Sequence, residues 1–472
     1  MKILVVSLLR VGDLLQQVPL LQGLRHKYAQ AEIHLMINRQ CEGISDLLNT
    51  FVDQIHFFER EQYLKRVSQQ TPLLERVSAI QAALSVLPVF DIAFNFSHTR
   101  LSVDVIDAIS AKEIKGLHRN SEGMMDLQGN RWLQYYNECF SGNRKSFFHG
   151  NEILSGAFDI QAQKLEIDFR SSDLIVFQCF TSDIKKNWSL RNFKALKDMI
   201  LESYPNCRIQ ILCALHEKKV LLEYFAEEEV IDCTFSEAFS ILKEAKALVS
   251  VDTSIKHLGA LAQVPILEIN LGGSDVVKTG AYSQKTWNVH ADVGCYPCVH
   301  SQNCSQKSQI CSDEISTLKA FNRFQELMES KPQLQKESNY RKVWGSYLSG
   351  VSNFKLQCLD GDNSKLKDIS KVTQKLETAL RSIQLSLSQS HKEVNTEALM
   401  PCLLLLREVL QMDRGNYFGS LKDVFTEKFI DSDELFSKIF KELTKAKDLV
   451  SLHLQLLNEL DQDGYREAHD AP

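Results

Sequence analysis

The 472-residue chain lacks several features that mark particular classes of protein. No uncharged apolar stretch reaches the roughly 18–20 residues that a membrane-spanning helix needs. Lys and Arg total 54 against 60 acidic residues, a formal net charge of −6, so electrostatics gives no reason to expect a nucleic-acid partner. No internal repeat or low-complexity tract is visible, and 44% of the residues are hydrophobic. The sequence therefore predicts a globular protein with more than one domain, cytoplasmic or at most peripheral to a membrane.

The amino-terminal apolar run does not read as a signal peptide. Arg10 and Asp13 interrupt it within about a dozen residues, and no small-residue cleavage site follows. The chain has 12 cysteines, of which eight are scattered and are expected to be reduced thiols, several of them in the core: Cys41, Cys139, Cys179, Cys207, Cys213, Cys233, Cys358 and Cys402. The other four fall within one short segment and need a separate explanation.

Apolar runs that alternate with helical periodicity predict two doubly wound α/β domains. The first set of expected strands lies at 2–7, 31–38, 54–58, 90–96 and 113–117, with a long helix around 71–86, before a polar stretch from about 141 to 172. The second set lies at 174–180, 208–214, 230–235, 247–251 and 265–270, with helices from Asn192 and from about Ile255. We predict domains at 1–165 and 172–325 and a helical extension at 326–472. Helices are expected near 314–330, 366–388, 396–411 and 433–460.

Asp13 follows the first predicted strand and begins the next helix. Ligands of open α/β sheets bind beyond the carboxyl ends of the strands, so a carboxylate at this position faces the ligand crevice. One interpretation is a general base that takes a proton from an attacking hydroxyl. The other is a helix-capping residue, with Gly12 easing a sharp turn.

Three segments of the second domain have the composition of an anion site. Lys186 lies in a strand-to-helix loop, where a lysine can hold a phosphate or simply be solvated. Asp252, Thr253 and Ser254 join a strand to a helix that carries His257, and free N–H groups at a helix start suit a diphosphate. The same three residues could instead only cap that helix. Gly272 either permits close approach to a ligand or forms a turn.

The order and spacing of these motifs resemble glycosyltransferase family 9, the ADP-heptose:lipopolysaccharide heptosyltransferases. The resemblance rests on Arg10-x-Gly12-Asp13, Lys186-x-Trp188, Val251-Asp252-Thr253-x-x-x-His257-Leu258 and Thr279-Gly280-x-Tyr282, and it covers roughly residues 1–312. It implies a GT-B fold, in which two Rossmann-like domains face each other across a cleft. It also implies an inverting reaction without a required divalent metal. A nicotinamide-dependent oxidoreductase is disfavoured, because no G-x-G-x-x-G follows the first strand.

The resemblance also implies roles for individual residues. Asp13 matches the catalytic base, Lys186 matches a lysine near the donor diphosphate, and Asp252, Thr253 and His257 match the nucleotide-sugar loop. Two departures stand out. The family usually has glycine where this chain has Ser254, and its Phe-Gly-Pro-Thr-type turn appears here as the sequence 270–274, which contains Gly272.

The expected partners are ADP-heptose and a hydroxyl acceptor. For a lipopolysaccharide-core acceptor, Arg10, His118 and Arg119 are the candidate contacts, although the last two would equally suit an ordinary surface pair. A serine or threonine of an autotransporter or flagellin is the alternative acceptor, and a non-catalytic nucleotide-sugar scaffold is the alternative class. Contact with the inner face of the inner membrane and oligomerisation through the carboxy-terminal helices are compatible with the sequence.

Four cysteines cluster as Cys295-x2-Cys298-x5-Cys304-x6-Cys311. Four thiolates near one another suit a tetrahedral metal centre with sulfur at about 2.3 Å, and C-x2-C is a usual first pair of ligands. Disulfides are the alternative, but nothing indicates an oxidising compartment. The sequence predicts a structural zinc or iron site, because four sulfur ligands leave no open position for a substrate, and both metals suit tetrahedral sulfur. Similar insertions occur in the family's protein-heptosylating branch, where iron is expected.

Overall fold

The computed structural model describes residues 1–329 except 68–70, 128, 142–147, 163–170, 284–285, 292 and 299–301. Two parallel sheets and one antiparallel pair of strands lie in this part of the chain. Both parallel sheets belong to one compact unit that contains Met1–Gln134, His149–Asp292 and Tyr296–Leu334. A second unit includes Tyr135–Phe148 and Val293–Cys295, and within it the rings of Tyr135 and Phe148 pack edge to face.

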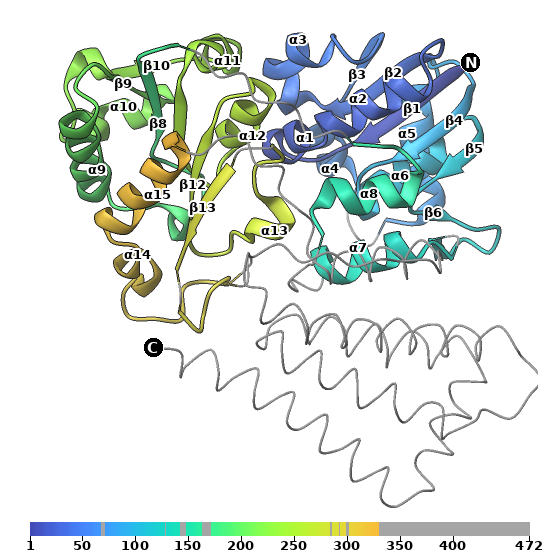
Figure 1. The fold of residues 1–472 in the computed structure, drawn as a ribbon. Helices are drawn as coiled ribbons and strands as arrows, with labels where there is room; N and C mark the ends of the chain where they lie inside the picture. Colours follow the sequence, from blue (N-terminus) through green and yellow to red (C-terminus); the bar gives the residue numbers. More distant parts are fainter. Residues whose placement is uncertain are drawn as a thin grey trace, which may run out of the picture. The chain divides into compact units, whose positions relative to one another are not determined.

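The first sheet has the strand order β3-β2-β1-β4-β5. Its strands are β1 (Lys2–Ser7), β2 (Glu32–Asn38), β3 (Gln54–Phe58), β4 (Phe90–Asn95) and β5 (Ala111–Lys115). The connecting helices are α1 (Val11–Gln16), α2 (Val18–Lys27), η1 (Arg39–Ile44), α3 (Ser45–Leu48), α4 (Arg60–Arg66), α5 (Leu73–Leu84) and α6 (Arg100–Ala108). Parallel strands with helical crossovers are covered on both faces, which explains why β1 is an almost continuous run of buried aliphatic residues (Figure 1).

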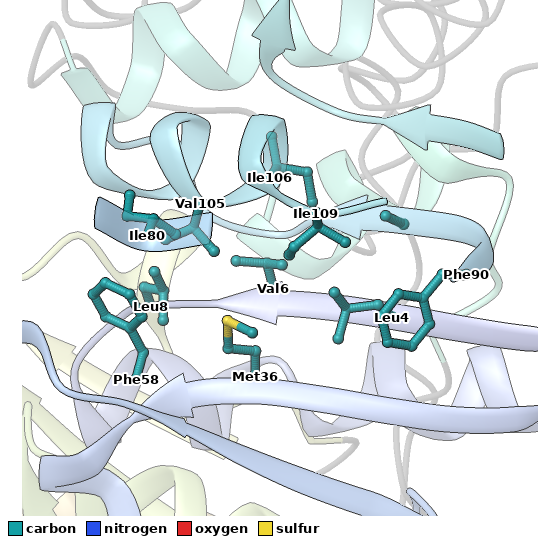
Figure 2. Packing of buried hydrophobic residues seen from close by; sticks show 11 residues of the cluster. Leu4, Val6, Leu8, Met36, Phe58, Ile80, Phe90, Val105, Ile106 and Ile109 are labelled. Carbon is teal, nitrogen blue, oxygen red and sulfur yellow. The ribbon is translucent and has the colours of Figure 1, made fainter. Parts of the chain in front are cut away.

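One hydrophobic cluster shows how this sheet is held to its helices. Figure 2 shows Leu4, Val6 and Leu8 opposite Val105 and Ile106, the two residues that α6 contributes. The cluster is completed by Met36, Phe58, Ile80, Phe90, Ala93 and Ile109. The alternate residues of β1 point to this side because successive side chains of a strand face opposite ways. The cluster fixes β1, and so it fixes the point at which the chain turns into α1.

The second sheet has the order β10-β9-β8-β11-β12-β13. Its strands are β8 (Leu174–Gln178), β9 (Arg208–Cys213), β10 (Val230–Asp232), β11 (Ala247–Val251), β12 (Ile266–Asn270) and β13 (Thr286–His290). Its helices are η2 (Ile184–Lys186), α9 (Leu190–Ser203), α10 (Leu215–Leu221), η3 (Glu227–Glu229), α11 (Phe235–Glu244), α12 (Ser254–Leu261), α13 (Val276–Thr279), α14 (Ile310–Glu314) and α15 (Thr317–Glu329). Between the two sheets the chain forms β6 (His118–Arg119), β7 (Met125–Asp126), α7 (Arg131–Ser141) and α8 (Gly150–Phe158).

Every strand expected from the sequence is present. Among the elements that the sequence did not predict, β13 extends the second sheet and α8 lies in the polar stretch from about 141 to 172. The start of α8 has an uncommon capping arrangement: His149 accepts a hydrogen bond from the N–H of Asn151, while Glu152 accepts one from the N–H of His149. Histidine is not among the usual N-cap residues, so the local signal was weak.

Some predictions fall beyond the described residues. The helices expected at 366–388, 396–411 and 433–460 lie outside them, as does most of the predicted boundary between 165 and 172. The domain limits therefore stay predictions. Within the described part of the chain, no helix combines the length and the apolar character needed to cross a membrane.

Candidate functional site

Asp13 lies in the first turn of α1, directly beyond the carboxyl end of β1. Its side chain reaches solvent, yet the surrounding protein displaces enough water to raise the pKa of its carboxyl. The positive charge and the N–H of Arg10 oppose this rise, as does the charge of Lys186, whereas Asp252 adds to it. The electrostatic effects of Lys186 and Asp252 place the predicted base in range of the predicted donor site.

Lys186 and Asp252 form the centre of the predicted donor site. Asp252 directly follows β11, and its Oδ2 accepts a hydrogen bond of 2.6 Å from Nζ of Lys186, the last residue of η2. Burial alone would raise the pKa of Asp252, but the ammonium groups of Lys256 and Lys186 hold that pKa well below its usual range. Asp252 is therefore ionised at neutral pH and orients Lys186 rather than capping α12.

The start of α12 supplies oriented N–H groups next to this ion pair. Thr253 is the N-cap residue, and its side chain makes no capping hydrogen bond within the described part of the chain. The N–H of Lys256 donates to the carbonyl of Thr253 at 3.3 Å. The N–H groups of Ser254 and Ile255 precede it in the first turn, where a helix N-terminus favours an anion. Ser254, where the resembled family has glycine, lies beside Gly12: a Cβ added to Gly12 would be 3.6 Å from Cα of Ser254. The start of α1 thus abuts the start of α12.

His257 is buried one turn into α12. Its Nδ1 has no hydrogen-bond partner among the described residues. Burial lowers the pKa of His257 well below its usual range, and the nearby charge of Lys256 adds to this effect, so the ring is neutral at physiological pH. The unsatisfied nitrogen next to the predicted diphosphate site is consistent with a ligand-facing role, which stays a prediction.

Gly272 has a structural reason to be glycine. Its φ is +59°, and an added Cβ would lie 2.5 Å from the carbonyl oxygen of Lys185. Glycine therefore brings the loop that follows β12 against the backbone of the loop that carries Lys186. Its predicted contact with the donor remains untested, but its place beside that loop is clear.

The predicted acceptor contacts have partners of their own. Arg119 donates to Oδ2 of Asp107 and to Oδ1 of Asp104, each at 2.5 Å, and its side chain is only 10% exposed. His118 hydrogen-bonds the carbonyl of Gly116 through Nδ1 at 2.9 Å. Arg10 is exposed and lies within electrostatic range of Asp13. The acceptor roles of these three residues stay predictions, and Arg119 also has a structural role in the first sheet's half of the unit.

The cysteine segment contacts both loops of the predicted donor site. The N–H of Cys298 donates to the carbonyl of Gly272 at 2.8 Å, and Lys185 Nζ donates to the carbonyl of Gln302 at 2.5 Å. Nε2 of Gln309 donates to the carbonyl of Lys185 at 2.6 Å. Among the described residues, no group of three or more His, Cys, Asp or Glu side chains is placed to hold a metal ion. The metal site predicted for Cys295, Cys298, Cys304 and Cys311 stays a prediction.

Two residues of the site were missed by sequence reasoning. Lys256 is fully buried between Asp252 and Glu268, and its Nζ lies 2.5 Å from Oε1 of Glu268. The available signal was a charged residue in an apolar setting: Lys256 lies four residues after Asp252 on a helix, and Glu268 lies in the middle of the buried strand β12. Charged residues are almost never fully buried unless they are paired.

Comparison with known proteins agrees with this geometry. The model of glycosyltransferase family 9 (heptosyltransferase) matches residues 152–309. The fold resembles E. coli heptosyltransferase WaaC solved with ADP, with a TM-score of 0.50 and 16% identity over 69% of this chain and 100% of that one. E. coli ADP-heptose lps heptosyltransferase II has a TM-score of 0.43 and 13% identity over 70% of this chain and 98% of that one. The iron-containing dodecameric glycosyltransferase TibC from enterotoxigenic E. coli has a TM-score of 0.41 and 12% identity over 70% of this chain and 78% of that one.

A search of curated proteins returned no match. The matched segment of the family model contains Lys186, Asp252 and His257, and the two parallel sheets agree with the fold expected from the sequence. Residues 152–309 are therefore similar to glycosyltransferase family 9 (heptosyltransferase), and the chain has the GT-B fold of the solved heptosyltransferase WaaC.

Proposed function

We propose that this protein is an inverting glycosyltransferase that moves a heptose from ADP-heptose to a hydroxyl of the lipopolysaccharide core. The observation that carries the proposal is the electrostatic proximity of Asp13 to Lys186 and Asp252. These residues come from the two different sheets of one compact unit, and Gly12 lies against Ser254. That is the juxtaposition that an attacking acceptor and a departing diphosphate require.

Asp13 acts as the general base in this proposal. Its carboxylate accepts the proton of the acceptor hydroxyl while the hydroxyl oxygen forms a bond to the anomeric carbon of the heptose. The bond from that carbon to the diphosphate oxygen breaks on the opposite face, so the configuration is inverted. A pKa raised by desolvation makes Asp13 a stronger base than a fully hydrated carboxylate.

The leaving diphosphate is stabilised by fixed positive groups. Negative charge grows on the departing ADP, and Lys186 together with the N–H groups at the start of α12 faces this charge. Groups that are already oriented need little reorganisation during the reaction. We therefore propose that transfer needs no divalent metal, and EDTA in the assay should leave the rate unchanged.

A protein hydroxyl is the second candidate acceptor. The observation that favours it is the four-cysteine segment, which resembles insertions in the protein-heptosylating branch. We propose that this segment carries a structural zinc or iron on its four thiol ligands. Metal analysis of the purified chain and of a variant with all four cysteines replaced by serine tests this proposal: equal metal content in the two proteins refutes it. The cytoplasmic location and the oligomeric state stay predictions.

The deciding experiment offers both acceptors in parallel. The protein is incubated with ADP-heptose and either heptose-deficient lipopolysaccharide core or autotransporter and flagellin fragments, and the products are analysed by mass spectrometry. A gain of one heptose on the core, absent with Asp13→Asn, supports the proposal. A gain on the protein fragments alone assigns the second acceptor. If ADP-heptose neither stabilises the protein thermally nor is consumed, the function is a scaffold's and the proposal fails.

A further inference from the structure

Lys256 is a buried cation held by two carboxylates. It lies in the first turn of α12 and has no exposed surface. Its ammonium contacts Oδ1 of Asp252 and lies 2.5 Å from Oε1 of Glu268. Burial alone would lower the pKa of Lys256, but the two carboxylates more than offset this and raise it, so the group stays charged. Burying a charge is costly, and the cost is offset only when the charge is closely paired, as it is here.

Glu268 links this cation to a second loop. It lies in β12, its side chain is fully buried, and its Oε2 accepts a hydrogen bond of 3.0 Å from the N–H of Ala281. Ala281 follows α13 in the segment that contains Thr279 and Gly280. Four charged groups therefore form one continuous chain, in the order Lys186, Asp252, Lys256 and Glu268. Lys186, at its outer end, has 17% of its side chain accessible and Asp252 has 8%, whereas Lys256 and Glu268 are fully buried.

We propose that Lys256 and Glu268 are positioning residues that set how strongly Lys186 attracts the donor diphosphate. Lys256 engages Oδ1 of Asp252, which leaves only Oδ2 for Lys186. The carboxylate is thereby shared between two cations, and less of its charge is directed at Lys186. This inference rests on the proposed function, because it assigns the ligand of Lys186 as the diphosphate of a nucleotide sugar.

Loss of Lys256 has a defined electrostatic consequence. Without it, both oxygens of Asp252 can turn toward Lys186. Asp252, which now pairs with two lysines, would then pair with Lys186 alone. Lys186 would then compete less well for phosphate oxygens, because its nearest negative charge is less compensated. The affinity for the donor should therefore fall. Asp13 should stay in place, because it lies in α1, which follows β1 of the first sheet.

A purely structural role makes a different prediction. Removing one partner of a buried pair destabilises a protein, whereas replacing both partners with neutral groups of similar volume often leaves stability unchanged. The double variant Lys256→Met/Glu268→Gln removes both charges and keeps a side-chain oxygen that can accept from Ala281. If the pair only supports the fold, this double variant should have both the stability and the activity of the parent protein. If the pair positions Lys186, the double variant should have the stability of the parent but a lower affinity for the donor.

A second lysine–glutamate pair offers a matched control. Lys197 Nζ lies 2.8 Å from Oε1 of Glu229, and their side chains are 12% and 18% exposed. This pair joins α9 to η3 in the same half of the molecule, and none of the contacts described for the predicted donor site involves it. Lys197→Met/Glu229→Gln should leave both donor affinity and turnover at their original values.

The experiment compares the full-length chain with both double variants. Thermal unfolding, ADP affinity by calorimetry, and KM and kcat for ADP-heptose are measured for each. We expect Lys256→Met/Glu268→Gln to unfold near the parental temperature, to bind ADP about tenfold more weakly and to raise the donor KM by a similar factor, with kcat changed less than threefold. Parental ADP affinity in a folded variant overturns the inference. A parent that binds ADP but transfers no heptose instead overturns the proposed function.

A second variant covers the case in which methionine is not tolerated. Lys256→Gln/Glu268→Gln keeps a neutral donor that can still reach Asp252, so the carboxylate keeps part of its orientation but loses the neighbouring charge. We expect ADP affinity to fall about threefold, between the values for the parent and for the methionine variant. Affinity equal to the parental value contradicts the role of the Lys256 charge.

Discussion

Replacing Asp13 by asparagine should abolish transfer and spare donor binding. The side chain keeps its volume and one oxygen acceptor, and α1 makes no side-chain capping bond at its start in the described structure, so the helix should form as before. The lost proton acceptor should cost about 10²–10⁴ in kcat, or about 3–5 kcal/mol of barrier. ADP affinity should be retained or slightly increased, because a negative charge in range of Lys186 has been removed. Asp46→Asn, an exposed carboxylate in the first turn of α3, is the control and should have parental activity.

The same carboxylate gives the reaction its pH dependence. The base works only when ionised, so kcat/KM should be constant at neutral pH and fall as the pH drops through the raised pKa of Asp13, above the range of an ordinary aspartate. Arg10 lowers that pKa, so Arg10→Gln should move the acidic limb to higher pH. A carboxyl whose pKa is raised by folding stabilises the folded state at low pH, and this contribution is lost as the pH rises through the raised pKa. Asp13→Asn should therefore be slightly more stable than the parent at pH 7.

The assay is ADP release under single-turnover conditions, with donor affinity measured separately by calorimetry. Single turnover separates chemistry from product release, which steady-state kcat does not. Weakened ADP binding with an unchanged single-turnover rate would refute the assignment of Asp13 as the base. An acidic limb at the position of an ordinary hydrated aspartate would refute the reasoning about desolvation.

Three further predictions concern residues around the site. Lys186→Met should raise the donor KM at least tenfold and lower kcat in the same kinetic assay, because Lys186 faces the charge that develops on the diphosphate; equal effects on KM for the donor and for the acceptor would contradict this. Gly272→Ala should destabilise the protein by about 1–3 kcal/mol in urea unfolding, because of its positive φ and the close carbonyl of Lys185, whereas Gly43→Ala, with open space around it, should not. Arg119→Met should cost about 3 kcal/mol, because Asp104 and Asp107 lose a buried partner; a raised acceptor KM with unchanged stability would restore its predicted acceptor role.

The parallel sheets and the position of Asp13 could be predicted because they depend on local order. A strand, a short loop and a helix follow one another within a dozen residues, and the crossover rules for parallel strands then place each loop at the same edge of the sheet. Asp13 lies in the first turn of the helix after β1, and Asp252 directly follows β11. The structure places these two carboxylates in electrostatic range of each other. The order and spacing of the motifs then indicated which of the strand-to-helix loops form the candidate site.

The Lys256–Glu268 pair could not be predicted in the same way. Each residue was visible as a charge within an apolar segment, but their pairing depends on how α12 packs against β12. Arg119 is a second case. The sequence offered an acceptor contact or an ordinary surface pair, and it did not indicate the ion pairs that Arg119 makes with Asp104 and Asp107 of α6. In both cases the tertiary neighbours of a charged side chain decide its role.

The contacts that the segment after residue 309 makes with Trp188 and Tyr204 determine the shortest fragment containing the second sheet that should fold on its own. Nε1 of Trp188 donates to the carbonyl of Ile315 at 3.0 Å, and Phe324 of α15 packs its ring against Tyr204, which follows α9. A fragment cut at the end of the family match, residue 309, would strip this cover from a fully buried indole only two residues from Lys186. Expression of the part of the chain that holds the second sheet should therefore run through α15, to Glu329, if it is to yield a soluble product.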